Sequence, residues 1–276
     1  MVPHRFSMIN IAVCARKSNT CPAGAILGFS PCLFSWKEKF FAVWEGMASF
    51  IYITDVFCPW CFGFAPVMQK LAEEYGFPVR VLCGELVDEP TPTAKMGTPR
   101  LLAFFQRLSD TTGREISQGF FDLLKQENSV IMDSRRSALL MAALKKLVPG
   151  HALEQMETFQ EVFYTQGRDV LDLAVQTDAA SRWGVDASTL ENALESEAVQ
   201  QKAEAEMAEA EEILGDFVVY PSLFVKADDG TLHAVARGYA PYPEVKGKIE
   251  AALASSEAGQ SEVSAYACGL DGSGCC

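Results

Sequence analysis

The sequence predicts a mixed α/β fold in which a large all-helical insertion separates the two halves of one small β-sheet. Three observations predict it: a strand–helix–strand pattern over residues 47–93, helical patterns throughout residues 94–213, and a strand–strand–helix pattern over residues 214–254. Because the helical block lies between two groups of strands, we interpret it as an insertion into the sheet-forming domain and not as a domain that follows it.

The first half is predicted to be a βαβ unit. Residues 50–56 (FIYITDV) alternate β-branched and aromatic side chains, which is typical of a strand. A helix is predicted to open at Cys58 and to end near Glu74, with a kink at Pro66. Residues 79–86 (VRVLCGEL) predict the second strand. The connections are short, so the two strands are expected to be parallel.

The insertion shows helical spacing in several segments, which glycine residues and a Pro-Gly pair interrupt. These segments are 101–108, 118–126, 134–146, 152–165, 170–183 and 187–214. The run EAEMAEAEE (204–212) predicts a charge-rich helical face exposed to solvent.

The second half is predicted to be a hairpin followed by a helix. Strand patterns return over residues 217–225, and the DDG sequence at 228–230 predicts a turn into a return strand at 232–236. A final helix is predicted over residues 242–254. Residues 255–276 are rich in glycine, serine and glutamate, and we expect them to form a flexible tail that carries cysteines.

Composition excludes several classes of partner. A chain of 276 residues with 49% apolar residues is long enough to bury a substantial core. Its 36 acidic and 23 basic residues give a formal net charge of −13, which argues against nucleic acid or an anionic membrane as partner, because phosphate binding needs a basic face. We find no apolar run of about 18 residues that would predict a transmembrane helix.

Residues 1–46 show no sustained periodicity, and prolines interrupt the apolar stretch that could serve as a secretory leader. We interpret them as an N-terminal extension that is either disordered or wrongly assigned to the protein. The nine cysteines are odd in number and unevenly distributed, unlike those of a secreted disulfide scaffold. We therefore expect a cytoplasmic location; a genuine leader in residues 1–46 would imply the periplasm.

A Cys-Pro-Trp-Cys motif stands where a predicted strand gives way to a helix. The free amides and the dipole of a helix N-terminus favour a thiolate, so we expect a lowered pKa for Cys58. Cys61 lies one turn further along, more buried but close enough to attack a mixed disulfide on Cys58. Pro59 suits the first helical turn because it has no amide hydrogen. The motif favours a redox pair with Cys58 as attacking thiol and Cys61 as resolving thiol.

Two other interpretations of this cysteine pair stay open. A zinc site would need two further ligands, which only Cys83, the tail cysteines and three scattered histidines could supply, so we predict no metal site here. Alternatively, the two thiols are inert or form a structural disulfide. A helix start is a poor place to bury inert thiols, and a disulfide across this spacing would be strained and reducible.

The motif resembles the active-site helix of thioredoxin-fold proteins, since Cys58-Pro59-Trp60-Cys61 follows a strand and Pro66 comes five positions after the second cysteine. Together with the helical insertion, it makes the chain similar to DsbA-type dithiol oxidoreductases, and particularly to the FrnE-like branch with its Cys-Pro-Trp-Cys sequence. The stretch YTQGRDV (164–170) and the Gly238-Tyr239 pair agree with this resemblance, which covers roughly residues 49–254.

The resemblance implies a thioredoxin fold and a cis-proline that precedes the third sheet strand and packs against the reactive disulfide. Pro221 stands at that place and completes the implied catalytic set. Tyr220 would then present its backbone to an extended substrate, as an added strand does, and Pro59 and Trp60 would contribute to substrate binding. The alternative is that Pro221 merely starts an edge strand.

Asp55 lies three residues before Cys58, at the end of a strand that is expected to be buried. A carboxylate there could relay a proton to or from Cys61. The alternative is a surface residue that caps the loop.

The C-terminal tail ends in a glycine-rich segment with three cysteines. These are Cys268, Cys275 and Cys276. They could act as accessory thiols that shuttle electrons to the Cys-Pro-Trp-Cys pair, or bind a soft metal, in which case the protein would be a metal-binding protein. The remaining interpretation is a loose tail with incidental thiols.

These patterns predict a thiol–disulfide oxidoreductase that acts on proteins or on small thiols such as glutathione and needs no bound cofactor. Pro59 and Trp60 place no cation beside the thiolate, so we expect an intermediate or reducing potential and a reductase or isomerase rather than an oxidase. The first alternative is a kappa-type glutathione transferase or a 2-hydroxychromene-2-carboxylate isomerase. Those enzymes resemble the chain in the insertion but usually lack the second cysteine.

Overall fold

The computed structural model describes residues 47–96, 98–125 and 130–265. The N-terminal extension over residues 1–46 and the three tail cysteines lie outside the described residues, so the expectations for them stay predictions. In the described part of the chain, none of the helices combines the length and the apolar character needed to cross a membrane.

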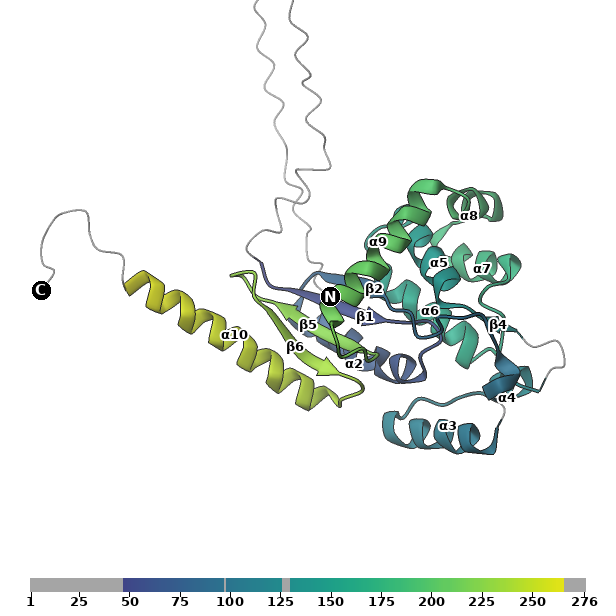
Figure 1. The fold of residues 1–276 in the computed structure, drawn as a ribbon, viewed down its shortest axis with the longest axis horizontal. Helices are drawn as coiled ribbons and strands as arrows, with labels where there is room; N and C mark the ends of the chain where they lie inside the picture. The colour runs from purple at the N-terminus through teal and green to yellow at the C-terminus, as the bar shows by residue number, and fades with distance from the viewer. Residues whose placement is uncertain (1–46, 97, 126–129, 266–276) are drawn as a thin grey trace, which may run out of the picture. The chain divides into compact units, whose positions relative to one another are not determined.

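The central sheet has four strands in the order β2-β1-β5-β6 (Figure 1). β1 and β2 are parallel, whereas β5 is antiparallel to both β1 and β6. The strands are β1 (Ser49–Thr54), β2 (Val79–Cys83), β5 (Ser222–Lys226) and β6 (Leu232–Arg237). The predicted parallel βαβ unit and the hairpin of the second half are therefore confirmed.

Both faces of β1 are buried, because helices cover each side of the sheet. Tyr52 points towards α2 (Pro59–Tyr75), and its ring centroid lies 6.0 Å from that of Phe64. Ile53 points the opposite way and packs in a cluster with residues of α9 (Glu197–Leu214). This alternation of side chains fixes α2, the helix that carries the two cysteines, on one face of the sheet.

The segment between β2 and β5 is mostly helical. Its α-helices are α3 (Pro99–Thr112), α4 (Gln118–Leu123), α5 (Ser134–Leu147), α6 (Ala152–Tyr164), α7 (Leu173–Ala180), α8 (Ala187–Leu194) and α9, with short 3₁₀ turns at Thr93–Met96 and Ser181–Trp183. α6 packs against both α2 and β2, and α5 packs against α9, so the insertion continues the core of the sheet-forming domain.

The expectation of an all-helical insertion is wrong in one respect. β4 (Ile131–Met132) lies inside it and pairs antiparallel with β3 (Thr91–Pro92). The amide of Thr93 extends the pairing by donating to the carbonyl of Val130 at 2.8 Å. Strands of two residues are too short to show an alternating pattern, so tertiary contacts decide their conformation.

The last helix, α10 (Tyr242–Ala265), is longer than predicted and packs against β6 and α2 (Figure 1). We expected it to end at Ala254 and a flexible tail to begin at Ser255. Alanine, glutamate and glutamine between residues 255 and 265 favour a helix, and the glycine and serines among them do not end it.

Candidate active site

Cys58 caps the N-terminus of α2. Its backbone is extended, with φ −86° and ψ 112°, and its Sγ accepts a hydrogen bond from the amide of Cys61 at 3.2 Å. Pro59 occupies the first turn, as predicted. Both cysteines are free thiols; Cys58 is 3% exposed, and Cys61 is fully buried. The arrangement brings the two sulfurs of the motif together at the start of one helix.

Burial raises the pKa of the Cys58 thiol well above its usual range, and the neighbouring Cys61 thiol raises it further. The amide of Cys61 acts in the opposite direction, because it stabilises the thiolate. The expected lowering of this pKa is therefore wrong in direction: the helix amide is in place, but the loss of hydration outweighs it. Burial of the pair thus opposes formation of the Cys58 thiolate, and the Cys61 amide favours it.

Pro221 lies at the same end of the two central strands as the cysteine pair. Ser222, the first residue of β5, pairs with Ile53 of β1, and the chain reaches Cys58 five residues after that pairing. The Tyr220-Pro221 peptide bond is cis, as the resemblance implied. The topology thus places the proline beside the end of β1 from which the loop to Cys58 leaves the sheet.

Tyr220 is fixed by the loop that follows β2. Its hydroxyl accepts a hydrogen bond from the amide of Glu85 at 3.0 Å. Its ring lies so close to Gly84 that a Cβ at position 84 would be 2.1 Å from a ring carbon. Glycine is required at this position because a side chain would displace the tyrosine. The tyrosine ring therefore forms a firmly held wall beside the cis-proline.

Trp60, the third residue of the motif, packs between the insertion and the second half of the sheet-forming domain. Its ring meets Phe104 of α3 edge to face at 5.8 Å and lies 5.7 Å from the ring of Tyr239. The partly buried tryptophan therefore forms an aromatic surface next to the cysteine pair.

Asp55 is buried, with 1% of its surface exposed, so it is not the surface residue of the alternative interpretation. Its buried carboxylate nevertheless caps the loop, as that interpretation also expected. Oδ1 accepts a hydrogen bond from the amide of Phe57 at 2.7 Å, and Oδ2 accepts one from the amide of Leu86 at 3.2 Å. Its charge acts on Cys58, whose pKa it raises. Burial raises the pKa of Asp55 itself to about 6.

With this geometry described, the sequence can be compared with known proteins. Residues 51–214, more than half of the chain, match the model of the DsbA-like thioredoxin domain family. The chain belongs to this family. No curated protein sequence matches the chain significantly.

Solved structures show the same DsbA-like thioredoxin fold. A candidate protein disulfide isomerase from Nitrosomonas europaea is 20% identical over 76% of this chain and 98% of its own, with a TM-score of 0.65. The cytosolic disulfide reductase DsbM from Pseudomonas aeruginosa is 20% identical over 74% of this chain and 98% of its own, with a TM-score of 0.60. Its structure with GSH gives 18% identity, coverages of 74% and 98%, and a TM-score of 0.59.

Sequence analysis missed two residues that hold the loop of the candidate site. From α6, Gln160 donates to the carbonyl of Asp55 at 3.1 Å, and the hydroxyl of Tyr164 donates to the carbonyl of Phe57 at 2.6 Å. Both side chains are buried. They stand four residues apart and so share one helix face. The only sequence signal was the stretch that begins at Tyr164, which carried the family resemblance but not this role.

We expect Tyr164→Phe to lower the free energy of unfolding by about 1–2 kcal/mol, because the buried carbonyl of Phe57 would lose its donor. Chemical denaturation monitored by circular dichroism measures this loss. Tyr239→Phe is the matched control, since the Tyr239 hydroxyl makes a longer, exposed hydrogen bond of 3.4 Å to Thr111. Equal losses in both variants would mean that the hydrogen bond from Tyr164 to the Phe57 carbonyl contributes nothing particular to stability.

The raised pKa of Asp55 predicts a pH dependence of stability. The folded protein binds the Asp55 proton more tightly than the unfolded chain does, so this contribution is present below about pH 4 and is lost as the pH rises through about 6. We expect the free energy of unfolding, relative to that of Asp55→Asn, to fall by about 2 kcal/mol between pH 4 and pH 7. Denaturation series at both pH values test this; a constant difference between the two proteins would contradict it.

Among the described residues, no group of three or more histidine, cysteine, aspartate or glutamate side chains could hold a metal ion. Cys83 is buried at the end of β2, and burial raises the pKa of its thiol to about 12, against the opposing effect of Lys145. His151 stands at the start of α6 and interacts with Glu154 of the same helix. Of the further zinc ligands that the sequence could offer, those within the described residues form no metal-binding group with the cysteine pair.

Proposed function

We propose that the protein is a thiol–disulfide oxidoreductase of reductase or isomerase type that works through Cys58 and Cys61. The Cys58 thiolate attacks a substrate disulfide, forms a mixed disulfide and releases the first substrate thiol. Cys61 then attacks the sulfur of Cys58, which forms the Cys58–Cys61 disulfide and releases the second thiol. The substrate gains two electrons and two protons, and a thiol such as glutathione must reduce the protein again.

One observation carries the proposal: the Cys58 sulfur stands at the N-terminus of α2, 3.2 Å from the amide of Cys61, at the sheet edge that also holds the cis-proline Pro221. An amide directed at a sulfur stabilises the thiolate as it forms. Pro59 and Trp60 then shape the surface in front of the sulfur, and the Tyr220 backbone offers hydrogen bonds to an extended substrate.

We infer the direction of exchange from the acidity of the pair. DsbA is a strong oxidant because its reduced form is stabilised. Here burial raises the pKa of Cys58, so the reduced form gains no such stabilisation. A pair of this kind reduces disulfides more readily than it introduces them. The name of the DsbM relative, a cytosolic disulfide reductase that was also solved with GSH, supports this direction, a cytoplasmic location and a small thiol as electron donor.

Asp55 completes the proposed site as a proton relay. With a pKa of about 6, it can exchange a proton near neutral pH, and its charge reaches the Cys58 thiol. In the mechanism above, a proton must leave Cys58 before its attack and another must leave Cys61 before the second step. No bound cofactor is needed for either step.

Reduction of insulin by glutathione tests the proposal. We compare the parent protein with Cys58→Ser, Cys61→Ser and, as a buried thiol outside the motif, Cys83→Ser. Both motif variants are expected to lose more than 90% of the catalysed rate, because each removes one of the two exchange steps, and Cys83→Ser is expected to retain it. Full activity in both motif variants would overturn the proposal.

A further inference from the structure

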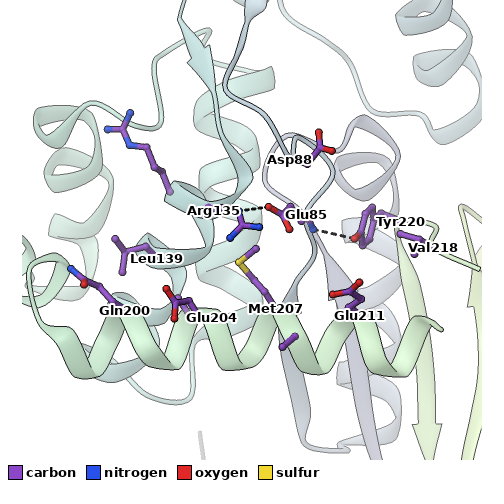
Figure 2. A pocket seen from close by; sticks show the side chains of 13 residues that line it. Glu85, Asp88, Arg135, Leu139, Gln200, Glu204, Met207, Glu211, Val218 and Tyr220 are labelled. Carbon is purple, nitrogen blue, oxygen red and sulfur yellow. Dashed lines mark hydrogen bonds and ion pairs between the residues drawn. The ribbon is translucent and has the colours of Figure 1, made fainter. Parts of the chain in front are cut away.

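A pocket of about 590 Å³ opens beside the cis-proline (Figure 2). Tyr220 forms one wall, and Glu85 of the loop after β2 lies next to it. α5 and α9 supply the other walls, with Leu139 and Met207 among the apolar side chains. Tyr220 directly precedes Pro221, so the pocket adjoins the proposed site on the side of the Tyr220–Pro221 peptide bond.

The charge that the pocket offers to a ligand is negative. Four of its lining residues are carboxylates and two are arginines, but Arg135 is already paired with Glu85. Arg136 keeps its charge, since its hydrogen bond at 3.4 Å goes to the neutral carbonyl of Leu171, so that one arginine faces the three carboxylates that remain beside the Glu85–Arg135 pair. By contrast, Glu204 and Glu211 form no ion pair with the described residues of the chain.

The carboxylates of Glu204 and Glu211 and the apolar side chains form a mixed surface that is partly acidic and partly apolar. In Figure 2, Glu204 and Glu211 rise from α9 on either side of Met207, and Leu139 faces them from α5. A lysine or arginine side chain matches such a surface, because its aliphatic stem packs on apolar groups while its charged head reaches the carboxylates. A neutral side chain would offer no charge to the two carboxylates, and an acidic one would be repelled by them.

We propose that this pocket selects polypeptide substrates by binding a basic residue that lies within a few positions of the reactive cysteine. The inference rests on the proposed function, since it places the cysteine at Cys58 and the flanking chain along Tyr220. The net charge of −13 acts in the same direction, because an acidic protein attracts basic substrates over a distance.

The test uses two peptides that each form a mixed disulfide with a small chromophoric thiol. They are identical except that the residues on both sides of the cysteine are lysine in one and glutamine in the other. We expect the lysine peptide to have a kcat/KM about three- to tenfold higher at low salt, with most of the preference lost at high salt. The Glu204→Gln/Glu211→Gln double variant is expected to abolish the preference while keeping the rate with the glutamine peptide.

Glu212→Gln is the matched control, because Glu212 follows Glu211 on α9 but does not line the pocket. It removes one charge and should retain most of the preference. No preference in the parent protein, or the same reduction in the control as in the double variant, would overturn the inference. The same peptides with serine in place of cysteine measure binding without chemistry. Stronger binding of the lysine form to Cys58→Ser would support the pocket even if the proposed exchange reaction failed.

Discussion

Cys61→Ser is expected to accumulate a mixed disulfide on Cys58 when it is incubated with oxidised glutathione, because the second thiol that resolves this species is missing. The parent protein should instead form the internal Cys58–Cys61 disulfide and retain no glutathione. Intact-protein mass spectrometry distinguishes the two products. Cys14, Cys21, Cys32 and the three tail cysteines are replaced by serine in every protein of this comparison, so that the thiols outside the described residues do not react.

Two variants control this experiment. Cys58→Ser should take up no glutathione on Cys61, which is fully buried. Cys83→Ser should behave like the parent, because Cys83 lies at the end of β2, outside the motif, and takes part in neither exchange step. A stable adduct on Cys61 in the Cys58→Ser protein, or none on Cys58 in Cys61→Ser, would reverse or remove the assignment of the attacking thiol.

Gly167→Ala is expected to lower the free energy of unfolding by about 3 kcal/mol or more. Gly167 has a φ of +63°, and a Cβ there would lie 2.2 Å from the carbonyl carbon and oxygen of Gly119 and 2.7 Å from the amide of Phe120. These are backbone atoms, so the turn after α6 and the start of α4 would have to separate. Strained backbone and steric overlap each cost about 1–3 kcal/mol.

Gly184→Ala separates the two causes. Gly184 also has a positive φ, of +74°, but no atom of the described residues lies within 4 Å of the place where its Cβ would stand. We expect this variant to lose only about 1 kcal/mol, the cost of the left-handed backbone alone. Thermal and chemical denaturation of both variants provide the comparison. Equal losses would mean that the close approach of Gly167 to Gly119 contributes nothing to stability.

Local patterns were sufficient to predict the sheet and the cysteine pair. A strand followed by Cys-Pro-Trp-Cys places the first cysteine at a helix start, because strand alternation and the proline of the first turn are both local signals. Pro221 could be assigned only through the family resemblance, since nothing in the residues around it distinguishes a cis-proline from one that starts an edge strand.

The environment of the site could not be predicted in the same way. The pKa of Cys58 depends on how much water reaches its sulfur, and that is decided by packing between segments far apart in the sequence. Gln160 and Tyr164 lie more than 100 positions from the loop they hold, and the sequence contains no signal that pairs them with its carbonyls. β4 and the far end of α10 were missed because the signals there were short or mixed.

The reduction potential of the Cys58–Cys61 couple tests most directly whether this pair is a reductase centre. The protein, with Cys14, Cys21, Cys32 and its tail cysteines replaced by serine, is equilibrated in glutathione buffers of graded ratio, and the fraction of oxidised pair is measured after acid quenching and thiol alkylation. We predict a single two-electron transition between about −200 and −300 mV, in the range of glutaredoxins and thioredoxin. A potential near −120 mV, the value for DsbA, or no disulfide between Cys58 and Cys61 at any ratio, would contradict the assignment.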